Sequence, residues 1–247
     1  MEEVLALIEK KKQEFAKSGL FEFMRDKSID PRQRLAFAPC IAPFVMSFGD
    51  LNKYVFREEP TNDPLQAIVN KYSYEDDHHW LWFLEDLETL GINGTLKFSD
   101  ALSFLWSEQT KASRLVTYQI FRYASGASPI AKLAILEVIE ATGNVFFSAA
   151  APIAEELRTI TQKEFLYFGC FHLEVENNHS KDLPEQRRLI ENIQLTIESH
   201  QEAFDIVENL FEDFTKLTHE LLVYAKTRSF EKPFGKPYKI LQPLKTA

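Results

Sequence analysis

The sequence contains little glycine and few cysteines, and it lacks long apolar runs. Eight glycines among 247 residues, combined with long periodic apolar segments, favour helices over sheet. The two cysteines, Cys40 and Cys170, are too few for a disulfide framework, so we expect a reducing cytoplasmic environment. No stretch of about 18 apolar residues occurs, and the N-terminal segment MEEVLALIEKKKQEF lacks the apolar core of a signal peptide. We therefore predict no membrane span.

An excess of basic residues is also absent. The formal net charge is −9, which argues against a nucleic-acid partner because such partners require a basic surface. The apolar share of 45% and the charged share of 26% are ordinary for a soluble globular protein. Aromatic residues are plentiful, with 21 phenylalanines, and this content is compatible with a homodimer. Composition therefore indicates a soluble protein and does not by itself identify a function.

Apolar periodicity predicts one all-α domain of about eight helices over residues 1–229, followed by an extended tail over 230–247. No segment shows the alternation typical of strands, and no internal repeat divides the chain. The wide apolar faces favour helices packed in layers around the second and fifth helices, rather than a lone four-helix bundle. The predicted helices cover about 2–18, 30–55, 63–90, 99–123, 129–149, 152–162, a segment that ends near 182, and 185–227.

Three polar side chains mark one predicted helix as a candidate site. His172, Glu176 and His179 are spaced i, i+4 and i+7, which puts them on one stripe within about 60° of arc on a helix. Two imidazoles and a carboxylate on one stripe are ligands that iron or manganese prefers. The alternative interpretation is a surface helix rich in polar groups.

A second predicted helix offers an acid and a histidine. Glu75 and His79 are spaced i, i+4 and share a helix face. Glu75 with His78, and Asp76 with His79, are spaced i, i+3 and remain open as alternatives. The pair Glu75–His79 is favoured because His79 and Trp82 then point inward together. Polar residues before an aromatic core patch are the alternative interpretation.

A third predicted helix places a carboxylate within an apolar run. Glu140 lies between Ile139 and Ala141, and Glu137 is the alternative one turn earlier. An acid in such a run must be paired, bound to metal or extended to the surface. The predicted donors are three carboxylates and three imidazoles, which suit two iron or manganese ions. They are Glu75, His79, Glu140, His172, Glu176 and His179.

These segments resemble the haem-oxygenase-like dimetal oxidases, a superfamily that includes the thiaminase-like TenA and PQQ-synthesis oxidase folds. Within it, the pattern is most similar to the CADD-like (chlamydial death-domain-associating) branch and to cyanobacterial iron-containing redox enzymes. The matching pieces are Glu75…His79-Trp80, Glu140-Ala-Thr-Gly-Asn-Val-Phe-Phe and His172-x3-Glu176-x2-His179. The resemblance covers about residues 30–225. Many relatives have Asp where this chain has Glu176, and either residue can ligate.

The resemblance implies a haem-oxygenase-like helical bundle and a cofactor of two non-haem iron ions, or of iron and manganese. It implies that the six predicted donors are the metal ligands. The implied reaction is the oxidation by dioxygen of a small substrate that bears an amine or a carboxylate. The aromatic residues that could line its cavity are Trp82, Tyr118, Phe147, Tyr167 and Phe171, and an ordinary place in the core is the alternative interpretation of each.

Other functions remain as alternatives. A true haem oxygenase needs a histidine on an early helix, and the first histidine here is His78, so we reject that assignment. A TenA-like hydrolase would use a cysteine nucleophile, for which Cys170 is the candidate, although a lone cysteine in an apolar run is more often a buried hydrophobe. A cofactorless oxidase of the PQQ-synthesis type and a non-enzymatic helical interaction protein complete the set.

Overall fold

The computed structural model describes residues 1–92, 94, 96–181, 184–231 and 234, and the side chains of residues 176–187 lie outside this description. Within the described residues, all regular structure is helical and no strand occurs, which confirms the all-α prediction. The elements are α1 Glu2–Phe15, α2 Gly19–Arg25, α3 Pro31–Arg34, α4 Ala38–Leu51, the π-helix η1 Asn52–Phe56, α5 Pro64–Asp76, α6 His79–Leu90, α7 Phe98–Leu105, the 3-10 turn η2 Glu108–Thr110, α8 Lys111–Ala124, α9 Pro129–Thr161, α10 Cys170–Lys181, α11 Pro184–Glu191 and α12 Ile197–Thr227.

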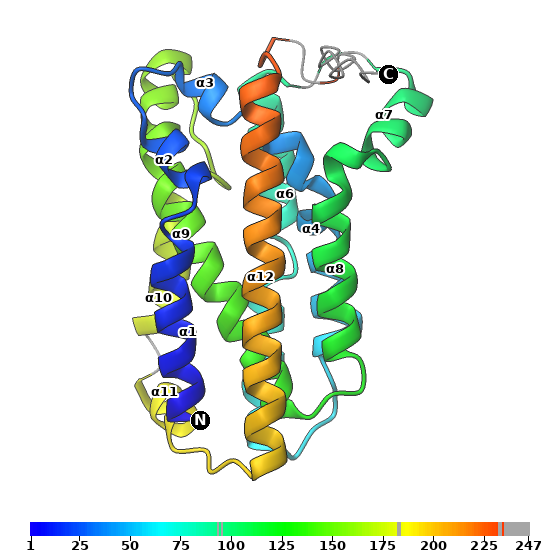
Figure 1. Ribbon diagram of the computed structural model, residues 1–247, viewed down its shortest axis with the longest axis vertical. Coiled ribbons are helices and arrows are strands. Elements are labelled where there is room, and N and C mark those ends of the chain that lie inside the picture. Colours follow the sequence, from blue (N-terminus) through cyan, green and yellow to red (C-terminus); the bar gives the residue numbers. More distant parts are fainter. Residues whose placement is uncertain (93, 95, 182–183, 232–233, 235–247) are drawn as a thin grey trace, which may run out of the picture.

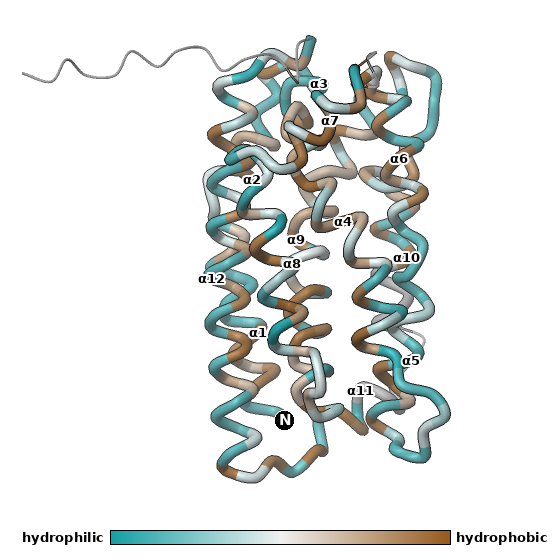
Figure 2. The backbone as a smooth tube through the Cα atoms, turned by 90° about the vertical axis from the view of Figure 1, so that its right-hand side faces the viewer, coloured by the Kyte–Doolittle hydropathy of each residue, from teal (hydrophilic) through white to brown (hydrophobic). Residues whose placement is uncertain are grey.

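The long helix α9 is the centre of the bundle. It packs against α12, α10, α1 and α5, and it also contacts α2, α3 and α8. In Figure 1, α12 runs along the front between α1 on the left and α8 on the right, with α9 behind them. Figure 2 shows teal and brown alternating along α12, as expected of a helix with one buried and one solvated face. The prediction that helices pack around the fifth predicted helix, which is the first part of α9, agrees with these contacts.

α9 also corrects one predicted boundary. The sequence predicts two helices, 129–149 and 152–162, the second of which starts at Pro152, yet Pro129–Thr161 is a single helix that contains Pro152. Proline removes one helical hydrogen bond. Burial of Ala150 and Ile153 on either side of it holds the chain in line. Tertiary packing therefore outweighs the local cost of the proline.

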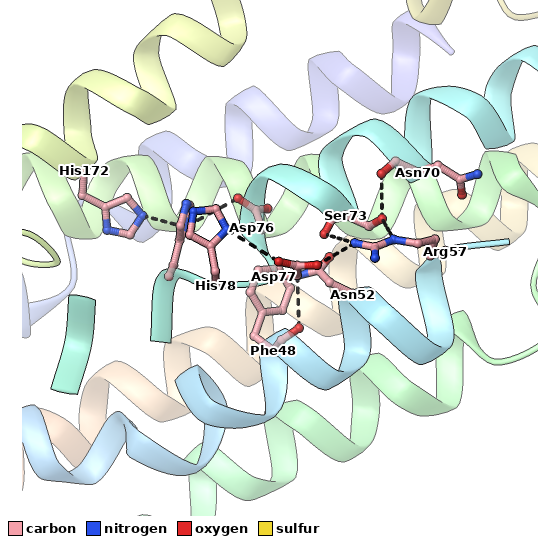
Figure 3. A network of polar contacts seen from close by, with 10 residues as sticks. Phe48, Asn52, Arg57, Asn70, Ser73, Asp76, Asp77, His78 and His172 are labelled. Carbon is pink, nitrogen blue, oxygen red and sulfur yellow. Dashed lines mark hydrogen bonds and ion pairs between the residues drawn. The ribbon is translucent and has the colours of Figure 1, made fainter. Parts of the chain in front are cut away.

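The prediction of one helix over 63–90 is also wrong, because two helices, α5 and α6, form there with a break at Asp77 and His78. The cause lies outside the segment. Arg57, just after η1, donates to the Ser73 carbonyl and to Asp77 Oδ2, each at 2.8 Å. Figure 3 shows the Arg57 guanidinium between these two residues. In an uninterrupted helix the Ser73 carbonyl would accept from residue 77, so the guanidinium satisfies an acceptor at the helix end.

The second predicted helix contains two prolines, Pro39 and Pro43, which have different effects on α4. Pro39 lies in the first turn of α4, where no helical hydrogen bond is lost. Pro43 lies inside α4, and a side chain from α8 compensates for it. The Phe44 N–H donates to Ser113 Oγ at 3.0 Å, and the Ser113 hydroxyl donates to the Ile41 carbonyl at 3.3 Å. The groups freed near the proline are thus satisfied across the helix interface.

The C-terminal part differs from the sequence prediction as well. The predicted helix 185–227 consists of α11 and α12, and the Thr196 side chain accepts from the Ser199 N–H at the start of α12. Most of the predicted tail, 230–247, lies outside the described residues. Among the described helices, α9 alone is long and apolar enough to cross a membrane, by length and composition only. Most of its apolar stretch is buried within the protein, as in the core helix of a globular domain.

Candidate functional site

A cavity of about 110 Å³ lies between α1, α4, α9 and α12 and reaches the break between α5 and α6. Its acidic and imidazole lining residues come from α5, α6, α9 and α10. They are Asp76, His79, Glu140 and His172. α1, α4 and α12 contribute a wall that is apolar apart from Thr218. The cavity thus places acids and imidazoles beside a largely hydrophobic space.

The break between α5 and α6 positions two of these residues. Asp76 is the last residue of α5 and His79 is the first of α6. Both are buried, and Asp76 Oδ1 lies 3.6 Å from His79 Nδ1. The His79 ring stacks on Trp82 with centroids 4.4 Å apart, which fixes its plane. The side chain of His78 is 49% exposed and lies beside Asp77, so His79 is the histidine that faces the cavity.

His172 on α10 contacts His79 of α6 at the cavity wall. Its Nδ1 lies 2.9 Å from the Tyr167 carbonyl, and its Nε2 lies 3.1 Å from His79 Nδ1. Burial lowers the pKa of His172 to about 4, so the ring is neutral at neutral pH. A carbonyl only accepts hydrogen bonds, so the single ring proton is on Nδ1 and the Nε2 lone pair points towards His79. Figure 3 shows His172 approaching the group that contains Asp76 and His78.

The loop that precedes α10 is held by Asp86 of α6. Asp86 Oδ1 accepts from the Leu166 N–H and Oδ2 accepts from the Phe168 N–H, both at 2.8 Å. Burial raises the pKa of Asp86 to about 6 despite these hydrogen bonds. The bonds flank Tyr167, whose carbonyl orients His172. Asp86 therefore controls the position of His172 through the backbone of this loop.

The carboxylates at the cavity lie close enough to disfavour one another's ionised forms. Burial raises the pKa of Asp76 well above its ordinary value, and the negative charges of Glu140 and Glu75 raise it further. Asp76 Oδ1 is buried without a hydrogen bond within the described part of the chain. An anion in such a place is costly unless a cation or proton compensates it. A bound cation would relieve this cost.

The structure brings together three of the six predicted donors, namely His79, Glu140 and His172. Glu75 is not among the cavity-lining residues, and its Oε1 lies 3.9 Å from Lys71 Nζ. Asp76, which the sequence offered only as an alternative, lines the cavity instead. The i, i+3 spacing of Asp76 and His79 in the sequence is the pattern that indicates this pair.

Two further predicted donors, Glu176 and His179, lie on the part of α10 whose side chains are outside the description. Within the described residues, no three His, Cys, Asp or Glu side chains form a group that could hold a metal ion by themselves. Glu137, the alternative to Glu140, does not line the cavity. Any complete metal site would therefore need donors beyond those described.

The predicted aromatic lining is correct in part. Phe147 and Tyr167 line the cavity, and Trp82 stacks on His79 without being part of the wall. Tyr118 is 56% exposed on α8 and Phe171 is 47% exposed, and neither lines the cavity, so the prediction is wrong for these two residues. Cys170 is exposed and does not line the cavity, which gives no support to a cysteine nucleophile there.

Neither a scan against protein-family models nor a search of curated proteins found a match to this chain.

One prediction concerns the two hydrogen bonds by which Asp86 holds the loop before α10, which we call the Asp86 clamp. Asp86→Ala is expected to destabilise the protein by about 3 kcal/mol, because it leaves the buried N–H of Phe168 and the partly buried N–H of Leu166 without an acceptor. Asp86→Asn retains one acceptor oxygen and should cost less. Thermal unfolding measures both effects, and the imidazole NMR signals of His172 report the loss of its fixed tautomer. Glu85→Ala, at an exposed position of α6, is the matched control. Equal stability of Asp86→Ala and Glu85→Ala would contradict the clamp.

Proposed function

We propose that the protein is a non-haem dimetal oxidase or oxygenase with a haem-oxygenase-like fold, which uses dioxygen to oxidise a small amine- or carboxylate-bearing molecule. The observation that carries the proposal is the hydrogen bond from His172 Nδ1 to the Tyr167 carbonyl. Histidines that bind metals almost always donate their other ring N–H to a carbonyl or carboxylate. This bond directs the Nε2 lone pair into a buried group of acids and imidazoles.

The chemistry of the donor set fits iron or manganese. Imidazole nitrogens and carboxylate oxygens are ligands for these ions, whereas copper(I) prefers sulfur, and magnesium or calcium prefers oxygen alone. The residues that would hold two ions are His79, Glu140 and His172, with Asp76 or Glu75, and with Glu176 and His179 of α10. Asp76 supports the fit because its buried Oδ1 accepts no hydrogen bond within the described residues. When bound, the two ions would supply electrons for the reduction of dioxygen.

The remaining residues prepare this site. The neutral His172 is available as a donor without first losing a proton, since burial keeps its pKa near 4. The Phe147 ring covers His172 with centroids 3.9 Å apart, and Trp82 covers His79. These rings exclude water from the imidazoles and hold their planes. The carboxylates of Asp76 and Glu140 would balance the charge of the ions.

Metal analysis tests the proposal. After anaerobic reconstitution with iron(II) or manganese(II), elemental analysis should find two ions per chain, and the iron form should consume dioxygen when reductant and substrate are present. His79→Ala and His172→Ala should each lower metal affinity at least tenfold, because each removes a donor. His78→Ala is the matched control, since this neighbouring side chain is half exposed. Unchanged metal content in His172→Ala, or no metal uptake by the unaltered protein, would refute the proposal.

A further inference from the structure

The part of the cavity wall that α1, α4 and α12 contribute is apolar apart from Thr218 and carries no positive charge. Among the described residues that line the cavity, none is lysine or arginine. α12 contributes Phe214, Leu217 and Leu221, and α4 contributes Phe44 and Phe48. A ligand that enters this space meets rings and aliphatic chains on these sides. An anionic or multiply polar body would lose its hydration without compensation there.

Two threonines line the cavity, and their hydroxyls donate within their own helices. Thr142 Oγ1 lies 2.9 Å from the Val138 carbonyl and 3.0 Å from the Ile139 carbonyl. Thr218 Oγ1 donates to the Thr215 carbonyl at 2.8 Å. Their hydroxyl protons are therefore not available to a ligand. Among the described lining residues, the acids and imidazoles that could bind a polar group of the ligand are Asp76, His79, Glu140 and His172, and the Tyr167 ring packs beside His172 with centroids 5.0 Å apart.

The volume of the cavity also restricts which ligands can bind. The volume of about 110 Å³ is somewhat smaller than the engineered cavity of about 150 Å³ in another protein, which is lined by Leu, Ile and Phe and binds benzene. Gly143 lines the cavity on the same face of α9 as Glu140, one turn further on. A Cβ added at Gly143 would lie 3.6 Å from the Phe147 ring, an ordinary contact, so alanine fits there without a clash. Its methyl group would occupy cavity space beside the acids.

We infer that the ligand of this cavity is a small molecule with an apolar body of about benzene size and a single polar group, and that Gly143 sets the size limit. The polar group lies at the Asp76–His172 end, and the body lies among the phenylalanine rings. This inference narrows the substrate class of the proposed function and rests on that function for its catalytic meaning. The binding itself requires no metal.

Binding to the metal-free protein, kept in chelator under anaerobic conditions, tests the inference. The probes are benzene, phenol, 4-fluorophenol and hydroquinone, and the readouts are calorimetric affinity and the shift in Tm. Phenol and 4-fluorophenol should bind at least as tightly as benzene. Hydroquinone should bind at least tenfold more weakly than phenol, because its second hydroxyl would lie among the rings. The similar size of 4-fluorophenol separates polarity from bulk. Equal affinity for hydroquinone and phenol would overturn the inference.

Variants test the role of Gly143. Gly143→Ala should raise the Tm of the ligand-free protein, because alanine favours helix, and should weaken phenol binding at least tenfold. Ser148→Ala, at an exposed position of the same helix, is the matched control and should leave phenol binding unchanged. Unaltered phenol affinity in Gly143→Ala would overturn the size limit. If phenol binds as expected but no metal loads, the proposed function fails and the ligand class stands. If metal loads but no probe binds, the ligand class fails and the proposed function stands.

Discussion

Gly169→Ala is expected to lower Tm by about 6–12 °C and to remove His172 from its place. A Cβ at this position would lie 2.0 Å from the Phe165 carbonyl oxygen, far inside van der Waals contact. Because the obstacle is backbone, the loop before α10 must rearrange. Its two hydrogen bonds to Asp86 would then break. Hydrogen bonds to a charged group contribute about 1.5–3 kcal/mol each, so the loss is at least about 3 kcal/mol.

Thermal unfolding followed by circular dichroism measures this loss, and metal titration measures the effect on the site. The matched control is Gly94→Ala, where an added Cβ would meet no atom within 4 Å. The control should retain its Tm and its metal affinity. A Gly169→Ala protein as stable as Gly94→Ala would show that the loop accepts a side chain. The proposal that the loop before α10 orients His172 through the Tyr167 carbonyl would then be wrong.

Asp76→Asn is expected to stabilise the metal-free protein at neutral pH while it weakens metal binding. Burial and the neighbouring charges of Glu140 and Glu75 raise the pKa of Asp76 well above 3.8, so its ionised form is unfavourable in the fold. Asparagine has nearly the same shape without the charge. The Tm should therefore rise by about 2–4 °C for every kcal/mol recovered.

The pH dependence follows from the direction of the shift. Below 3.8 the folded and unfolded states both hold the Asp76 proton, and the contribution to stability is complete. As the pH rises above this value, the unfolded state releases the proton while the folded state keeps it. Stability then falls until the raised pKa of the folded state is reached. Asp76→Asn removes this decline, so the advantage of the variant should grow from about pH 4 towards neutrality.

The adjacent acid gives a control of opposite sign. Asp77 accepts from Arg57 at 2.8 Å, and both side chains are mostly buried. Asp77→Asn weakens an ion pair and should lower the Tm. Tm measurements at several pH values in the presence of chelator distinguish the two neighbours. A decrease in Tm for Asp76→Asn would show that its charge is compensated in the fold, and the electrostatic argument for a cation at this cavity would fail.

The start of several helices could be predicted from the sequence because caps act locally. Asp30 accepts from the Arg32 N–H, and Asp63 accepts from the N–H groups of Leu65 and Gln66, each followed by a proline as the pattern predicts. Glu140 and His172 could likewise be selected as residues, because an acid or imidazole in an apolar helical run must face other polar groups. These inferences use only residues within a few turns of one another.

The choice of Asp76 over Glu75 at the cavity was decided by tertiary structure. It depends on the break at Asp77, which Arg57 causes from outside the helix. The continuous helix through Pro152 and the clamp by Asp86 also depend on partners distant in the chain. The sequence by itself determined the all-α class and most of the candidate polar residues, because helical periodicity and caps are local. Only the tertiary structure decided which acid faces the histidines, because that depends on where a helix is interrupted by a side chain from another element.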